Sequence, residues 1–130
     1  EKYPKTDFAL DAKFKIGLID DVLASKEMYL GRYYIKKEKW IPAINRFKNI
    51  LKNFDTTIYT EEAIHRLVEI HYKIGLEAEA RKYASLLSYN YLSSEWYEKS
   101  YKIFNKKYET RKLKKEKDKN GLIKKFKKLF

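Results

Sequence analysis

The chain contains no cysteine, and only four of its 130 residues are glycine and two are proline. Without cysteine it cannot form a disulfide, a thiol nucleophile or a cysteine-ligated metal site. Scarce glycine and proline, with no alternation of apolar and polar residues, favour an all-α chain. The chain also lacks an apolar run of about 18 residues, the length that a membrane-spanning helix requires. With 44% hydrophobic residues, we expect one helical domain with a continuous core.

Catalytic and cofactor signatures are missing as well. The chain has no phosphate-binding glycine loop, no His-Glu-x-x-His sequence and no serine in a sharp glycine turn. His65 and His71 are six residues apart on one expected helix and therefore point in different directions. His65 and Glu69 can share a face, but two side chains do not make a metal site. We therefore predict no enzyme activity, no cofactor and no metal.

A repeat motif is present between residues 30 and 54. Its key positions are a small residue, a tyrosine, a second small residue and an aromatic residue: Gly31, Tyr34, Ala43 and Phe47. This spacing is typical of a tetratricopeptide repeat, a pair of antiparallel helices. We expect Gly31 and Ala43 where the two helices cross, because only small side chains allow close approach. Tyr34 and Phe47 should fill the space beside the crossing.

A second, imperfect copy of the motif follows. It consists of Tyr72, Gly75, Ala80 and Tyr83, preceded by Leu67 and Val68. The alanines of the two copies, Ala43 and Ala80, are 37 residues apart, close to the usual repeat length of about 34. We therefore predict a tetratricopeptide-repeat α-solenoid with a long first helix and a C-terminal closing helix.

Local signals place five helices. Four of them are expected over about 7–36, 40–53, 77–89 and 95–105. The remaining helix begins at a Thr60 cap and ends at Gly75, which takes a left-handed conformation. Thr6 can cap the first helix. The alternative to one long first helix is a break near Ala24 and Ser25. The last helix would close the open end of the stack with Trp96 and its neighbours, because a repeat buries its face only on another repeat.

Charge divides the chain into a repeat domain over 1–105 and a lysine-rich tail over 106–130. The tail carries 12 Lys/Arg and 3 Asp/Glu of the 30 and 18 in the whole chain. Its end has one apolar helical face, which consists of Leu122, Ile123, Phe126, Leu129 and Phe130. Its cationic face consists of Lys124, Lys125, Lys127 and Lys128. One interpretation of the tail is a solubilising extension. A second is binding to an anionic membrane surface through Phe126 and these lysines. A third is contact with an acidic protein partner, or an additional helix of the stack.

The twelve tyrosines and many lysines also suggest nucleic acid, since aromatic side chains stack on bases. Most of these tyrosines, however, fall at expected core positions, and we predict no nucleic-acid binding by the body of the protein. Nucleic-acid binding through the tail stays a separate hypothesis for the function of the chain.

Arg46, three residues after Ala43, is expected on the outward flank of the second helix.

The chain resembles the C-terminal half of the BamD family, the repeat-containing lipoproteins of the outer-membrane β-barrel assembly machine. The matching phrases are Tyr3-Pro4, Phe8-Ala9, Asp11-Ala12, Leu23-Ala24, Glu27, Tyr33-Tyr34, Trp40, Ala43-Ile44-Asn45-Arg46, Glu62-Ala63, Gly75, Ala80, Asn90-Tyr91 and Ser94-Glu95-Trp96. They keep their order over about residues 2–97. Asp55 and Leu92 stand at positions where the BamD family usually has the proline of a Tyr-Pro-Asp sequence. Since Tyr3-Pro4 usually closes a repeat, we expect earlier repeats, and any targeting signal or lipid anchor, upstream.

The resemblance implies a non-enzymatic scaffold at the periplasmic face of the outer membrane of a Gram-negative bacterium. Its C-terminal repeats would dock on the POTRA domain of BamA nearest the barrel, and Arg46 matches the family arginine that pairs with an acidic residue there. Asn45, Trp40 and Lys37 complete the expected partner-binding set. Other lipoproteins of the machine are expected partners, and unfolded outer-membrane proteins are candidate clients. The alternative is a cytoplasmic, peptide-binding tetratricopeptide adapter.

Overall fold

The computed structural model describes residues 6–105 and 120–128 of the protein. Five helices make up its body: α1 Asp7–Lys36, α2 Trp40–Asn53, α3 Thr60–Lys73, α4 Glu77–Asn90 and α5 Glu95–Phe104. Residues 120–128 are also helical, and the described residues contain no strand. The all-α repeat fold is therefore confirmed. The Tyr3-Pro4 phrase, the tail segment 106–119 and the last two residues of the tail stripe lie outside the described residues.

The long helix α1 is continuous, so the alternative of a break near Ala24 and Ser25 is wrong. The Ser25 hydroxyl donates to the Val22 carbonyl at 2.7 Å, within the helix, instead of interrupting it. Thr6 caps the N-terminus as predicted, because its hydroxyl oxygen accepts from the Ala9 N–H at 3.3 Å. The helix ends at Lys36, and Glu38 in the turn that follows takes a left-handed φ of 54° although it is not glycine.

Only the C-terminal end of α3 agrees with the sequence prediction. Gly75 has φ 88°, and the N–H of Leu76 donates to the His71 carbonyl at 2.8 Å, which is a left-handed helix end. Thr60, however, is not the N-cap. It is the first residue of α3, and its hydroxyl donates to the carbonyls of Phe54 and Asp55 at 3.2 and 2.9 Å. The hydroxyl thus holds the preceding loop, and Tyr59 takes the cap position.

The first helix pair packs through the small residues of the motif. Gly31 and Ala43 are both buried, and the fully buried ring of Phe47 lies against Gly31. Tyr34 is partly buried and packs against the same core. Helix α2 contacts both α1 and α3, so this core continues into the second pair. Its buried members are Met28, Ala43, Ile44, Phe47, Ile50, Ala63, Leu67 and Ile70.

The second helix pair differs from the first in the sizes of the residues at the corresponding positions. Val68 follows Gly31 by the 37-residue spacing of the repeats, and Ala84 follows Phe47 by the same spacing. The larger side chain therefore comes from the first helix of this pair and the smaller one from the second. Ala80 is fully buried, as predicted, whereas Gly75 lies at the end of α3 and not at the crossing.

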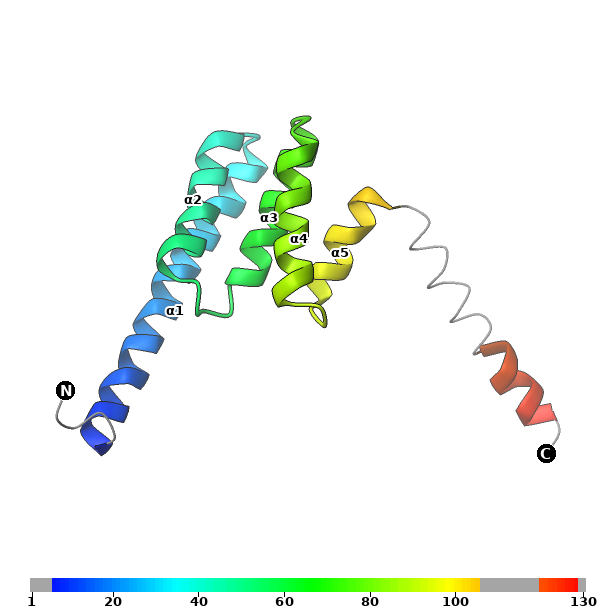
Figure 1. Ribbon diagram of the computed structural model, residues 1–130, viewed down its shortest axis with the longest axis horizontal. Helices are drawn as coiled ribbons and strands as arrows, with labels where there is room; N and C mark the ends of the chain where they lie inside the picture. The colour runs from blue at the N-terminus through cyan, green and yellow to red at the C-terminus, as the bar shows by residue number, and fades with distance from the viewer. Residues whose placement is uncertain (1–5, 106–119, 129–130) are drawn as a thin grey trace.

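Helix α5 closes the stack as predicted, since it contacts both α3 and α4 (Figure 1). Ser94 caps it by accepting from the Trp96 N–H at 3.2 Å. At the other end of the body, the first half of α1 extends past the end of α2 (Figure 1). Its large apolar side chains are exposed, and the buried core of α1 begins at Ala24. No helix among the described residues is both long enough and apolar enough to cross a membrane.

Candidate functional site

Arg46 lies on α2 and reaches a carboxylate of its own chain. Its Nη1 donates to the two oxygens of Glu27 on α1 at 3.2 and 3.4 Å. The side chain of Arg46 is 40% exposed and that of Glu27 is 16% exposed. Both residues line a shallow hollow of about 450 Å³ together with Asn45, which is exposed, and Ile41 and Asn49. Arg46 is therefore held in position at the surface without being covered.

The structure does not bring all four predicted partner-binding residues together. Asn45 adjoins Arg46, but Trp40 lines a different hollow, where the ammonium of Lys73 lies 4.9 Å from the centre of its ring. Lys37 follows the last residue of α1, and its ammonium lies 5.8 Å from the ring centre of Tyr33. Trp40 therefore belongs to a second surface, and Lys37 lines neither of the two hollows.

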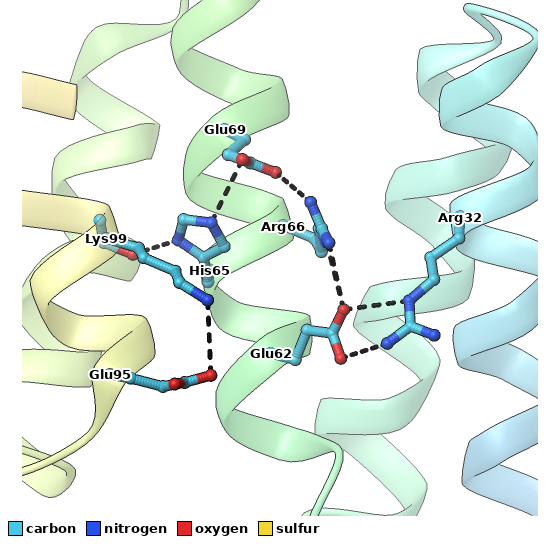
Figure 2. A network of polar contacts seen from close by, with 8 residues as sticks. Arg32, Glu62, His65, Arg66, Glu69, Glu95 and Lys99 are labelled. Carbon is cyan, nitrogen blue, oxygen red and sulfur yellow. Dashed lines mark hydrogen bonds and ion pairs between the residues drawn. The ribbon is translucent and has the colours of Figure 1, made fainter. Parts of the chain in front are cut away.

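A chain of polar contacts connects α1, α3 and α5 beside this second surface (Figure 2). Arg32 on α1 donates through Nε and Nη2 to both oxygens of Glu62 on α3. Arg66 links Glu62 to Glu69, donating to the latter at 2.9 Å. Because the Glu62 side chain is only 8% exposed, its charge requires these partners.

Glu69 continues the network to the closing helix. Nε2 of His65 lies 3.2 Å from Glu69, and Nδ1 lies 2.7 Å from the hydroxyl of Ser100 on α5. Burial by itself raises the pKa of Glu69, but the hydrogen bonds and charges of His65 and Arg66 outweigh it and lower the pKa from 4.5 to about 2. The network thus joins the first helix pair to α5 through one helix.

The histidines have structural partners. His65 is buried against Trp96, with ring centres 5.3 Å apart. His71 is buried as well, and its Nδ1 donates to the Leu67 carbonyl at 2.7 Å. Within residues 6–105 and 120–128, no group of three His, Asp or Glu residues could hold a metal ion.

Sequence reasoning missed the roles of Glu27, Arg32 and Glu62. The spacing of Glu62, Arg66 and Glu69 along α3 is a visible signal, because residues three and four apart on a helix face one another. The pairs Arg46–Glu27 and Arg32–Glu62 join different helices. They are 19 and 30 residues apart, and no local signal predicts them.

The described part of the tail presents both of its faces to solvent. Leu122, Ile123 and Phe126 are exposed, and so are Lys124, Lys125, Lys127 and Lys128. Residues 120–128 are helical, and helical spacing puts the apolar residues on one side of this helix and the lysines on the other. Leu129 and Phe130 complete the predicted stripe outside the described residues.

Stacked helix pairs that are closed by α5, with Gly31 and Ala43 buried between the helices of the first pair, define an all-α, tetratricopeptide-type repeat protein. The chain belongs to the YfiO family, described as an outer membrane lipoprotein, whose profile matches residues 1–87. Together with the two relatives described next, this match confirms the predicted resemblance to BamD.

Two relatives illustrate the similarity. The chain is 47% identical over 102 residues to the outer membrane protein assembly factor BamD of Rickettsia prowazekii, covering 78% of this chain and 41% of the relative. It is 42% identical over 105 residues to the BamD of Caulobacter vibrioides, covering 81% of this chain and 34% of the relative. The chain thus spans well under half the length of these relatives.

Proposed function

We propose that this chain is part of a non-enzymatic scaffold of the outer-membrane β-barrel assembly machine. It acts at the periplasmic face of the outer membrane of a Gram-negative bacterium and docks on the POTRA domain of BamA nearest the barrel. Family membership supports the role in assembly, and the names of both relatives favour it over a cytoplasmic adapter. The observation that carries the docking surface is Arg46, half-exposed and already held in position by Glu27.

The geometry of Arg46 suits a second carboxylate. Glu27 accepts hydrogen bonds only from Nη1 of Arg46. The edge of the guanidinium formed by Nε and Nη2 can therefore donate to a partner. A guanidinium edge can donate two parallel hydrogen bonds to one carboxylate, which the single ammonium of lysine cannot reproduce. The Glu27 contact also orients Arg46 before binding, which reduces the side-chain entropy lost on association.

Isothermal calorimetry with the purified BamA POTRA domain tests this docking surface. We expect Arg46→Glu to abolish most of the binding and Arg46→Lys to weaken it. Removal of one partner of a buried interfacial charge pair costs about 2–5 kcal/mol. Lys52→Glu is the matched control, because Lys52 is exposed on the same helix and its replacement reverses the charge in the same way.

Glu27→Gln separates the two roles of Arg46. Since it removes only the internal carboxylate, binding should change much less than with Arg46→Glu. Equal binding by the parent chain and Arg46→Glu would contradict the docking surface. If Lys52→Glu weakened binding as much as Arg46→Glu, the attraction would depend on overall charge and not on Arg46.

The tail adds a second contact in this proposal. Its helix over 120–128 lies on an anionic phospholipid surface, with the lysines facing the headgroups and Leu122, Ile123 and Phe126 facing the acyl chains. The exposed apolar and cationic sides of this helix support the assignment. The remaining partners, which are other lipoproteins of the machine and unfolded outer-membrane proteins, stay expectations from family membership.

A further inference from the structure

Three asparagines are placed four residues apart along α2. Asn45, Asn49 and Asn53 form one line on the helix, because residues four apart project from the same side. Asn45 and Asn53 are exposed, and Asn49 is partly exposed. Ile41, four residues before Asn45, continues the line with a side chain that is 65% exposed. We call these four residues the α2 stripe.

Two of these asparagines stand where the residue is unfavourable for the helix. Asparagine is a weak helix former, because its side chain competes for backbone hydrogen bonds, and it is more common at helix ends. Asn90 and Asn105 follow this preference at the ends of α4 and α5, whereas Asn45 and Asn49 lie inside α2. Within the described part of the chain, the amide of Asn45 has no hydrogen-bond partner, and Asn49 accepts only from Nδ2 of Asn53. The amides of Asn45 and Asn49 therefore keep hydrogen-bonding capacity for a partner.

The chemistry of the α2 stripe suits the main chain of a partner. A side-chain amide has both an acceptor and a donor, which match the N–H and the C=O of one residue. Phosphate groups would be bound better by lysine or arginine, which the tail offers instead. A partner helix keeps its own N–H and C=O groups paired internally, whereas an edge strand leaves a row of them unpaired. An uncharged amide stripe therefore favours an edge strand.

The spacing of the asparagines agrees with the repeat of a strand edge. Residues four apart on a helix are about 6 Å apart along its axis, since each residue rises about 1.5 Å. Every second residue of a strand points its N–H and C=O to the same edge, at a repeat of about 6.6 Å. Asn45 and Asn49 can therefore pair with two such residues of one strand that runs along α2.

The α2 stripe borders the hollow that contains Arg46. Ile41, Asn45 and Asn49 line this hollow of about 450 Å³ together with Pro42 and Arg46. A strand that lies on the stripe therefore brings its side chains to the guanidinium of Arg46 and to the apolar surface of Ile41. These two residues are about 7.5 Å apart along the helix axis, which is close to the length of two strand residues.

We propose that the α2 stripe binds an edge strand of the docking partner through the main chain of that strand. The inference rests on the proposed docking at Arg46 and adds the structural feature that the partner presents there. The strand carries a carboxylate that pairs with Arg46 and, about two residues away, an apolar side chain that packs on Ile41. Asn45 and Asn49 hold the backbone of the strand, so they set the register in which its carboxylate reaches Arg46.

Calorimetry with the purified BamA POTRA domain tests the stripe by combining Asn45→Ala with Asn49→Ala. We expect binding to weaken by about tenfold, because the strand loses its hydrogen bonds to two amides. Alanine is the better helix former, so this double variant should fold at least as stably as the parent chain. The matched control combines Ser85→Ala with Ser88→Ala, which removes two hydroxyls from α4, outside the Arg46 hollow. It should change binding by less than about twofold, whereas Ile41→Ser should weaken binding by removing the apolar contact.

Amide hydrogen exchange of the ¹⁵N-labelled POTRA domain, measured by NMR, tests the contact with the main chain. At equal occupancy by the parent chain or a variant, exchange should slow at alternate residues along one edge strand, because every second N–H faces the stripe. This protection should be lost with the asparagine double variant and kept with the serine double variant.

The other outcomes separate this inference from the docking surface itself. If Arg46→Glu weakened binding and the asparagine double variant did not, the edge strand would be wrong and the Arg46 contact would stand. If neither weakened binding, or if the parent chain did not bind, both would be wrong. Equal weakening by the asparagine and serine double variants, or protection confined to a helix or a loop of the POTRA domain, would also overturn the strand. Unchanged binding by Ile41→Ser would remove the apolar residue from the assigned strand.

Discussion

Gly31 lies so close to Phe47 that no side chain fits between them. A Cβ at residue 31 would be 2.5 Å from Cε1 and 2.6 Å from Cζ of the Phe47 ring, which is fully buried. The ring has no solvent-exposed space into which it can turn. The first helix pair therefore depends on glycine at this crossing, as the motif predicts.

We expect Gly31→Ala to destabilise the protein by about 1–3 kcal/mol, because overpacking displaces a buried ring or the helix itself. Urea unfolding, followed by circular dichroism, measures the change. Phe47→Leu should partly rescue Gly31→Ala by removing the clashing ring atoms. The control is Gly17→Ala in the exposed half of α1, where a Cβ meets nothing within 4 Å. It should stabilise the helix by about 0.5–1 kcal/mol. Equal effects of the two alanines would disprove the close crossing.

Glu62 is the second residue on which the body should depend. Glu62→Gln removes the charge that Arg32 and Arg66 share in a nearly buried place. We expect a loss of about 1–3 kcal/mol, less than for a fully buried ion pair because Arg32 is half-exposed. Glu61→Gln, its neighbour in the first turn of α3, is the control. It should change the free energy of unfolding by less than about 0.5 kcal/mol. A similar small effect of Glu62→Gln would show that the network contributes nothing to stability.

The helices were predictable because their signals are local. The bounds of α1 and α2 agree with the predicted 7–36 and 40–53, since Thr6 caps α1 and Pro42 is tolerated in the first turn of α2. The Thr60 cap was wrong because a hydroxyl can donate as well as accept. The carbonyls of Phe54 and Asp55, brought back by the loop, are its actual partners.

The sites were less predictable because they join distant residues. Spacing placed Arg46 at the surface, but nothing in the sequence indicated that Glu27 would reach it from another helix. In the same way, Trp40 was grouped with Arg46 in the expected partner-binding set, whereas the ring of Trp40 at the start of α2 lies beside the ammonium of Lys73. A one-dimensional pattern gives the face of a helix, and only packing decides what that face meets.

The low pKa of Glu69 makes stability depend on pH. In the unfolded chain its pKa is near 4.5, and in the folded chain it is about 2, so the folded state binds fewer protons between these values. The stabilisation is complete above about pH 5 and is lost as the pH falls toward 2. Since Glu69 is partly exposed, solvent screening limits the contribution to about 1–2 kcal/mol.

Urea unfolding at several pH values tests the Glu69 prediction. The free energy of unfolding of the parent chain should fall between pH 5 and pH 2, and Glu69→Gln should show a smaller fall. Glu79→Gln is a useful comparison, because Glu79 makes an exposed pair with Lys82 on α4. If Glu69→Gln followed the same pH curve as the parent chain, the contacts with His65 and Arg66 would not be the source of the dependence.

Truncation after Asn105 tests the predicted division into a repeat domain and a tail. Helix α5 ends at Phe104 and already packs on α3 and α4, so the closing helix is complete without the tail. We therefore expect the melting temperature to change little. Binding to vesicles that contain anionic phospholipid should be lost, since 12 of the 30 basic residues lie in 106–130.

Vesicle co-sedimentation of the full chain gives the matching measurement. Each lysine near an anionic surface contributes at most about 1 kcal/mol, and the attraction falls off within a Debye length. Binding should therefore be reversible, weak at high salt and nearly absent on neutral lipid. Replacement of Leu122, Ile123 and Phe126 by serine should weaken it further at constant charge, because the apolar side of the helix then contributes nothing. A large loss of stability on truncation would instead make the tail a packed helix of the stack, and the membrane contact would have to be abandoned.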